Sequence, residues 1–239
     1  MSLPWSKIKS LLKHQVIVSV QASKGEPLNR DDIIEALALS ALSGGAAGLR
    51  MANTLEDDPI GYFKQRHAEV PVIGLTKPVE IPKDAYQSVY ITPDTHAIDC
   101  LLRAQADVIA MDATQRQRPG EQTLAELVTH CRKSSQETPL MADVATLEEG
   151  LMAEALGFEM ISTTLSGYTS ETLSNANAGP DFQLLGNLVN RTNCPIVLEG
   201  RIWKPEEVKQ AFDLGAFAVV IGSAITRPHH ITQRFCASR

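Results

Sequence analysis

The sequence Val-Pro-Val-Ile-Gly-Leu-Thr-Lys occupies residues 70–77 and decides the fold. It is apolar and rich in β-branched residues until its last positions, and it then delivers one ammonium group, Lys77. A short uncharged run of this kind predicts a strand that is buried on both faces, as in a parallel sheet. Because α/β folds do their chemistry at the carboxyl ends of such strands, we expect Lys77 to lie in a functional pocket.

Further apolar segments have the same character, and helical patterns separate them. The predicted strands are residues 16–21, 47–52, 70–77, 107–114, 139–144, 158–165, 195–199 and 218–222. This alternation, without a break in composition over 239 residues, predicts an α/β protein of one domain, a (β/α)8 TIM barrel. A doubly wound sheet is the alternative, but it would show a glycine-rich first turn, and no Gly-x-Gly-x-x-Gly occurs in the sequence.

The first residues of the chain carry Lys7, Lys9 and Lys13 among apolar residues at helical spacing. We expect residues 1–15 to form a short helix that caps the amino-terminal face of the barrel, and residues 16–239 to form the barrel itself. A helix that lies on a membrane surface is the alternative.

Local signals set several boundaries along the chain. Asn29 is predicted to cap a helix whose first turn contains Asp31 and Asp32, and Thr146 with Glu149 predicts a capping box. Residues 78–88 read as an irregular insertion, and residues 89–92 as an extra short strand.

The overall composition excludes some classes of function. The net charge is -6 and the pI is near 5.5, which argues against a nucleic-acid partner but allows a small anion in a local basic pocket. No apolar run approaches the ~20 residues of a membrane span. The four cysteines are isolated from one another, as expected for reduced thiols in the cytoplasm.

Polar side chains end the predicted odd-numbered strands. Gln21, Lys77, Asp143 and Glu199 each follow an apolar run, and one interior layer of a barrel is built from alternate strands. These four side chains are therefore expected to share the mouth of the barrel, with Arg50 and Asp112 of the even-numbered strands nearby. An internal salt-bridge network is the alternative to a site.

Two glycine-containing turns follow the seventh and eighth strands, where barrels often bind phosphate. Gly200 with Arg201, and Gly222 with Ser223, are predicted to offer backbone amides and a guanidinium to an anion. Arg227 is a second candidate cation, whereas a plain turn is the alternative for Gly222 and Ser223.

Other charged and metal-binding residue types are set aside. All six histidines fall in or beside predicted helices, so no metal site is predicted. Arg116, Arg118 and Glu121 follow the fourth strand, where a solvated charge cluster is favoured over a contact with substrate.

Several motifs resemble a single enzyme family. They are Gly74-Leu75-Thr76-Lys77, Tyr90-Ile91-Thr92-Pro93, Met111-Asp112-Ala113-Thr114, Ser162-Thr163-Thr164-Leu165-Ser166-Gly167-Tyr168-Thr169, Glu199-Gly200-Arg201 and Gly222-Ser223-Ala224-Ile225-Thr226-Arg227-Pro228. From Val16 to about Phe235 the chain resembles the N-acetylmannosamine-6-phosphate 2-epimerases.

The resemblance implies a cytoplasmic isomerase of sialic acid breakdown, which interconverts N-acetylmannosamine 6-phosphate and N-acetylglucosamine 6-phosphate without metal or redox cofactor. It also implies a homodimer built partly from the last helix. The catalytic and substrate-binding positions of the family fall on Gln21, Arg50, Lys77, Asp143, Glu199 and Arg227. Since the family usually has Arg or Lys after the lysine, Pro78 and the longer insertion predict a different lid over Lys77.

Inversion at carbon 2 of an aldose requires that a proton is removed next to the carbonyl and that one is returned to the opposite face. Lys77 is the predicted base. One hypothesis pairs it with Asp143, so that a proton moves between them, and assigns Glu199 to the other face or to ring opening. A class I aldolase, with Lys77 as a Schiff base, and a non-catalytic phosphosugar sensor are the rival functions.

Overall fold

The computed structural model describes residues 3–54, 56–176 and 179–238 of the chain. Parallel strands close into a barrel in sequence order, and they are β1 (Gln15–Val20), β2 (Gly48–Asn53), β3 (Val72–Thr76), β4 (Val108–Asp112), β5 (Leu140–Asp143), β6 (Met160–Ser162), β7 (Ile196–Glu199) and β8 (Ala218–Ile221). The prediction of a (β/α)8 TIM barrel is confirmed.

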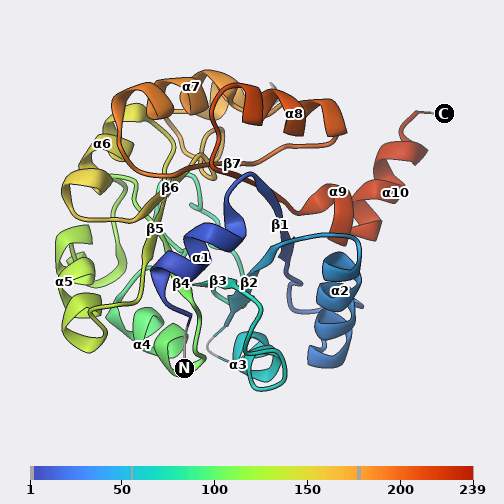
Figure 1. Cartoon of the computed structure of the whole chain (residues 1–239), viewed down its shortest axis with the longest axis horizontal. Helices are drawn as coiled ribbons and strands as arrows, with labels where there is room; N and C mark the ends of the chain where they lie inside the picture. The colour runs from blue at the N-terminus through green and yellow to red at the C-terminus, as the bar shows by residue number, and fades with distance from the viewer. Residues whose placement is uncertain (1–2, 55, 177–178, 239) are drawn as a thin grey trace.

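Most of the helices surround the barrel, as Figure 1 shows. The helices are α1 (Trp5–Leu12), α2 (Asp31–Ser43), α3 (Pro59–Lys64), α4 (Thr95–Arg103), α5 (Leu124–Ser134), α6 (Leu147–Ala155), α7 (Phe182–Arg191), α8 (Pro205–Asp213), α9 (Ser223–Thr226) and α10 (Pro228–Cys236), with 3-10 turns η1 (Pro119–Glu121) and η2 (Leu173–Asn175).

Strand β3 is buried along its whole length, as its sequence predicts. Ile73 and Leu75 belong to the apolar cluster inside the barrel, whereas Val72 belongs to the cluster between the sheet and the outer helices. A Cβ on Gly74 would lie 2.7 Å from the Cβ of Ala106, so only glycine lets this neighbour approach. Lys77 directly follows the strand, and its amide donates to the carbonyl of Asn53 at 2.9 Å.

Helix α1 closes the end of the barrel opposite the carboxyl ends of the strands (Figure 1). Its Ile8 and Leu12 are fully buried and belong to the cluster inside the barrel. The segment before α1 is also held, because Asp107 accepts from the amide of Leu3 at 2.8 Å and from Lys64 Nζ at 2.7 Å.

The predicted helix starts are partly confirmed. Thr146 and Glu149 form the predicted capping box at α6, and Asp31 and Asp32 occupy the first turn of α2. The prediction that Asn29 caps α2 was wrong, because the residue at that position is Arg30 in an extended conformation.

The prediction of an extra strand at residues 89–92 was wrong. This segment enters the gap where β3 and β4 diverge and bonds to both of them. The amide of Thr92 donates to the carbonyl of Thr76 at 3.1 Å, and its hydroxyl donates to the carbonyl of Ala110 at 2.7 Å. With a φ of 43°, Thr92 adopts the left-handed conformation, so the segment cannot continue as a ladder.

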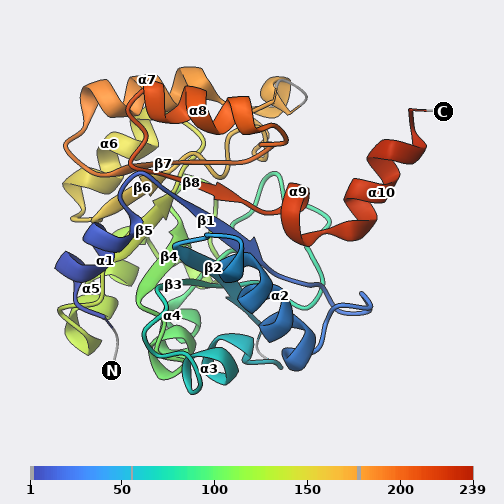
Figure 2. The same cartoon turned by 45° about the vertical axis from the view of Figure 1, so that its right-hand side comes forward.

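The last helix departs from the usual barrel arrangement. In Figures 1 and 2, α9 stays beside β1 while α10 extends away from the barrel. All nine residues of α10 are at least partly exposed. On the outer face of the barrel, a groove of about 500 Å³ between α2 and α9 is lined by Val16, Val18, Leu37 and Ile225, among others.

Candidate active site

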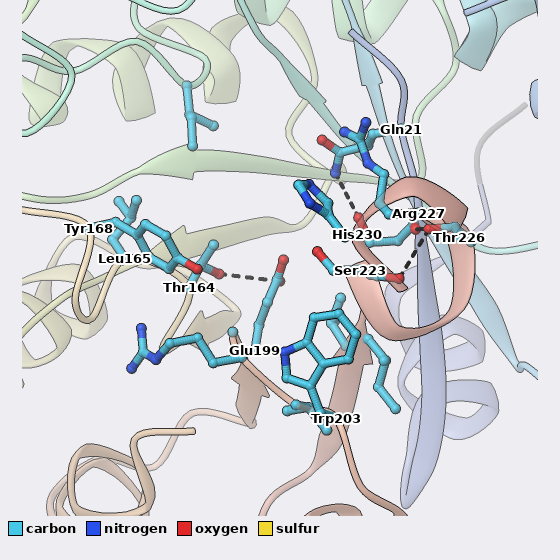
Figure 3. Close-up of a pocket in the computed structure, with 18 of the residues that line it drawn as sticks. Gln21, Thr164, Leu165, Tyr168, Glu199, Trp203, Ser223, Thr226, Arg227 and His230 are labelled. Carbon is cyan, nitrogen blue, oxygen red and sulfur yellow. Dashed lines mark hydrogen bonds between the residues drawn. The ribbon is translucent and has the colours of Figure 1, made fainter. Parts of the chain in front are cut away.

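A cavity of about 530 Å³ opens at the carboxyl ends of the strands. Gln21, Lys77 and Glu199 line it from the ends of β1, β3 and β7, and the turn at Gly222 lines it after β8. Figure 3 shows Gln21 and Arg227 on one side of the cavity and Thr164 and Tyr168 on the other.

The floor below this cavity holds a buried ion pair. Arg50 is only 1% exposed, and its two terminal nitrogens contact the two oxygens of Asp143 at 3.1 and 2.5 Å. Such a bidentate pair is the strongest kind of carboxylate contact. In the free protein Asp143 is thus paired with Arg50, and the hypothesis that it pairs with Lys77 as substrate binds stays a prediction.

Glu199 lies next to this ion pair. Its Oε2 is 3.2 Å from Arg50 Nη1 and 3.2 Å from the hydroxyl of Thr164, a contact drawn in Figure 3. Burial and the negative charge of Asp143 raise the pKa of Glu199 to about 7, against the opposing positive charges of Arg50 and Lys77. This carboxyl group therefore exchanges its proton near neutral pH.

Lys77 reaches the cavity from the opposite wall, since β3 and β7 are four strands apart in a ring of eight. Its ammonium donates to Oε1 of Gln21 at 2.8 Å. Burial and the positive charge of Arg50 lower the pKa of Lys77 to about 8, although Glu199 pulls it upward. Lys77 and Glu199 thus have pKa values much closer together than those of free lysine and glutamate.

Asp112 lies apart from this group of side chains. Its carboxylate accepts from Arg116 Nη2 at 2.5 Å and from the hydroxyl of Thr114 at 2.7 Å. The prediction of a solvated charge cluster here was wrong for two of its members, because Arg116 has a side chain only 9% exposed and Arg118 is 6% exposed. Arg118 donates to the carbonyl of Asp112.

Arg116 also holds the insertion at residues 78–88. Its Nη1 donates to the carbonyl of Ala85 at 2.6 Å. From the other side, the amide of Ser170 donates to the carbonyl of Tyr86 at 2.9 Å. The insertion is thus tied both to the loop after β4 and to the loop after β6.

The turn after β8 has the features predicted for anion binding. Ser223 begins the short helix α9, and the first amides of a helix have no partner within it. Arg227 lines the same cavity and forms an ion pair with Glu26. The phosphate-binding roles of Gly222 and Ser223 stay predictions, as does the substrate contact of Arg227.

The turn after β7 is built differently. Gly200 and Arg201 both have positive φ values, 110° and 58°. The guanidinium of Arg201 donates to the carbonyl of Gly179 at 2.6 Å and to that of Ser166. Arg201 therefore holds the loop after β6, and the phosphate-binding role of Gly200 and Arg201 stays a prediction.

Several residues of the cavity wall were not predicted as site residues from the sequence. They are Tyr90, Thr164, Tyr168, Trp203 and His230. For Thr164 a signal existed, because it follows Met160 and Ser162 at the two-residue period of the inward-facing positions of β6. For His230 none existed, because it comes from α10, which lies outside the ring of strands.

Some site types find no support in the part of the chain that the structure describes. No three His, Cys, Asp or Glu side chains are grouped there for a metal ion. Within the same residues, every helix is too short or too polar to cross a membrane. Among the described residues, Cys100, Cys131 and Cys194 are free thiols.

Comparison with known proteins points to one family. Residues 34–238 match the family described as putative N-acetylmannosamine-6-phosphate epimerase. Putative N-acetylmannosamine-6-phosphate 2-epimerases of Caldanaerobacter subterraneus and Oceanobacillus iheyensis are each 45% identical to this chain. Each match covers 94% of this chain, and the two matches cover 90% and 97% of the respective relatives.

Solved structures agree with this result. The N-acetylmannosamine-6-phosphate 2-epimerase of Clostridium perfringens is 39% identical, with a TM-score of 0.87 over 97% of this chain and 96% of its own. The thiamine phosphate pyrophosphorylase of Pyrococcus furiosus, at 16% identity and a TM-score of 0.59, shares only the fold. The matching length, identity and barrel geometry show that this chain belongs to the N-acetylmannosamine-6-phosphate 2-epimerase family.

Proposed function

We propose that the protein interconverts N-acetylmannosamine 6-phosphate and N-acetylglucosamine 6-phosphate by moving protons at carbon 2. The observation that carries this proposal is the placement of Lys77 and Glu199 on opposite walls of one cavity, with pKa values of about 8 and about 7. An inversion needs a proton carrier on each face of the carbon, and each carrier works best with a pKa near the operating pH.

The reaction begins with the open-chain aldehyde, in which the carbonyl acidifies the proton on carbon 2. One carrier takes this proton, and the electron pair of the C–H bond forms the C1–C2 double bond of an enolate. The other carrier then donates its proton to the opposite face of carbon 2. In the reverse direction the two carriers exchange roles, so the active protein holds one proton on the pair.

Positive charge below the cavity supports the enolate. The guanidinium of Arg50 is permanently charged, and Asp143 fixes its orientation through two hydrogen bonds. A preorganised charge of this kind stabilises a developing oxyanion without reorganisation during the reaction. In this proposal Asp143 is a positioning residue, since its oxygens are bound to Arg50.

The phosphate group lies, in our proposal, at the side of the cavity formed by Gly222, Ser223 and Arg227. Helix-start amides and a guanidinium suit a phosphate. This orientation places carbon 2, at the other end of the open sugar, between Lys77 and Glu199. Gln21, which accepts from Lys77 Nζ, would then adjust the lysine to the bound sugar.

The mechanism uses no metal or cofactor, because the two proton carriers and Arg50 supply both acid–base and electrostatic functions. Extensive dialysis against EDTA is therefore expected to leave the epimerisation rate within about twofold. A loss of activity that added divalent cations restore would overturn this part of the proposal.

We further propose a cytoplasmic homodimer acting in sialic acid breakdown. Reduced cytoplasmic conditions suit the free thiols of Cys100, Cys131 and Cys194. The exposed helix α10, whose Phe235 is 75% exposed, and the apolar groove between α2 and α9 are the surfaces that support a dimer.

Solvent deuterium exchange tests the function directly. N-acetylmannosamine 6-phosphate is incubated with the protein in D2O, and the carbon-2 proton is followed by NMR. We expect the proton signal to disappear as the epimer accumulates, whereas a phosphosugar sensor would leave it intact. Borohydride reduction with substrate separates the aldolase alternative, because only a Schiff base becomes covalently trapped on Lys77.

A further inference from the structure

The hydroxyl of Thr164 touches three polar groups at once. Its Oγ1 lies 2.7 Å from Asp143 Oδ1, 2.8 Å from Ser162 Oγ and 3.2 Å from Glu199 Oε2. A hydroxyl has one hydrogen and two lone pairs. Thr164 can therefore donate to only one of these neighbours, and a hydrogen bond with either of the others requires that Thr164 accepts it.

Asp143 receives the hydrogen of Thr164. This contact is the shortest of the three, and both oxygens of Asp143 are paired with the guanidinium of Arg50. An ionised carboxylate only accepts hydrogen bonds. If Thr164 donated elsewhere, its lone pair would face the negative charge of Asp143 at 2.7 Å.

Two lone pairs of Thr164 remain for the other contacts. The hydroxyl of Ser162 donates to one of them, since Ser162 is a free rotor at 2.8 Å. The second lone pair of Thr164 faces Glu199. It would repel an ionised carboxylate, but it can accept a hydrogen bond from a protonated carboxyl group. All three contacts are satisfied together only when Glu199 carries a proton.

We propose that Thr164 is a positioning residue whose hydroxyl accepts a hydrogen bond from the protonated carboxyl group of Glu199 and so favours the acid form of this side chain. The role of this acid, which is to donate a proton to carbon 2, rests on the proposed function. Lys77 and Arg50 face Glu199 from β3 and β2 and favour its ionised form, while Asp143 from β5 and the oriented hydroxyl of Thr164 oppose them. Arg227 faces Lys77 from the turn between α9 and α10.

The opposite orientation of the hydroxyl makes the opposite prediction. A Thr164 that donated to Glu199 Oε2 would stabilise the carboxylate and lower the pKa of Glu199, and its removal would raise that pKa. In the arrangement proposed here, the removal of the hydroxyl takes away the acceptor of the Glu199 proton and lowers that pKa. The sign of the change therefore decides between the two orientations.

The experiment is a carboxyl carbon-13 NMR titration of protein labelled with [13C]glutamate, without substrate. The resonance of Glu199 is assigned by its loss in Glu199→Gln. We expect the isosteric Thr164→Val to lower the pKa of Glu199 by about 0.5 to 1, the effect of one lost hydrogen bond. Thr164→Ser, which keeps the hydroxyl, is expected to keep the pKa, and the acidic limb of carbon-2 exchange should move with Thr164→Val by the same amount.

Thr163→Val is the matched control. Its hydroxyl donates to the backbone carbonyl of Glu199 at 3.0 Å and accepts from the Glu199 amide at 3.1 Å, so it holds the same residue without touching the carboxyl group. A loss of stability without a lower pKa is expected there. An unchanged or raised pKa in Thr164→Val, or an equal fall in Thr163→Val, would overturn the inference.

Failure of the proposed function gives a different result. If the wild-type protein shows no carbon-2 exchange, the epimerase proposal fails, while the substrate-free titration still reports the orientation of Thr164. If exchange occurs and the Glu199 pKa does not fall in Thr164→Val, only the inference fails.

Discussion

Lys77 and Glu199 approach the cavity from β3 and β7, and each begins from an unfavourable charge state for its task. A lysine is normally fully protonated at neutral pH, and a glutamate fully ionised. Burial moves both pKa values toward neutrality, to about 8 and about 7. Desolvation makes these two groups costly to bury in their charged forms, and the same desolvation makes them proton carriers near neutral pH.

Removal of either carrier should abolish epimerisation while sparing binding. Lys77→Ala and Glu199→Gln are each expected to lower turnover by about 10³-fold or more, because acid–base catalysis contributes effects of this size. The affinity for a phosphosugar should stay within about tenfold, since the phosphate is held elsewhere. Steady-state kinetics and calorimetric titration check this, and near-normal turnover in Lys77→Ala would remove the lysine from the mechanism.

The pair should also give a bell-shaped pH profile. Below about pH 7 Glu199 becomes protonated while Lys77 remains so, and no base is left. Above about pH 8 Lys77 loses its proton while Glu199 is ionised, and no acid is left. The profile of kcat/KM is therefore expected to peak between these values, and a flat profile from pH 6 to pH 9 would contradict the assignment.

The strand-end residues could be predicted because their positions follow from the two-residue period of β-structure. Gln21, Lys77 and Glu199 share one cavity for that reason. Their partners could not be predicted, since Arg50 reaches Asp143 across the interior, and sequence gives no measure of that reach. Arg116 and Arg118 were misjudged because a short run of charges usually lies in solvent, whereas here Arg116 pairs with the buried carboxylate of Asp112 and Arg118 donates to the Asp112 carbonyl.

Among the loops, the insertion at residues 78–88 is held in part by the contact of Arg116 with Ala85. The same guanidinium neutralises Asp112, which is fully buried. The side chain of Arg116 therefore links the position of the insertion to the stability of the buried carboxylate at the end of β4.

Arg116→Met should loosen both. Because it leaves the carboxylate of Asp112 buried without its cation, we expect a loss of roughly 3–5 kcal/mol in the free energy of unfolding. Amide hydrogen exchange at residues 84–88 should become faster than in the wild type. Asp112→Asn in the same background removes the buried charge, and a failure to recover stability would show that the ion pair is not the cause.

The helical elements illustrate which boundaries the sequence defines. At α6, the side chain of Thr146 accepts from the amide of Glu149 and the side chain of Glu149 accepts from the amide of Thr146. Because both bonds are local, the start of the helix was predictable. The segment at residues 89–92 was not, because its β-branched residues serve tertiary bonds to β3 and β4 rather than a ladder of their own.

For the molecule as a whole, α10 extends away from the barrel and has no buried residue. Phe235 is exposed there, and the groove between α2 and α9 is apolar. A homodimer in which α10 packs on a second copy would bury such surfaces. Arg234, which lies 4.8 Å from the ring centroid of Trp203, connects the helix to the cavity wall.

If the proposed dimer forms through α10, Phe235→Glu is expected to convert it into a monomer of 26.0 kDa, because a charge at the proposed contact cannot be buried without a partner. Light scattering after gel filtration measures the mass. Leu11→Glu is the control, since Leu11 is also exposed, at 40%, but lies on α1. A wild-type protein that is already monomeric would contradict the assembly.

Because α1 closes one end of the barrel, it affects which hydrogen isotope is delivered to carbon 2. With Ile8 and Leu12 filling one end of the barrel, water reaches the two carriers by the same route as the sugar, and a bound sugar blocks that route. The hydrogen delivered to carbon 2 must then be loaded before the sugar arrives. In heavy water the first molecules of epimer should carry deuterium, while the unreacted sugar still carries its original hydrogen.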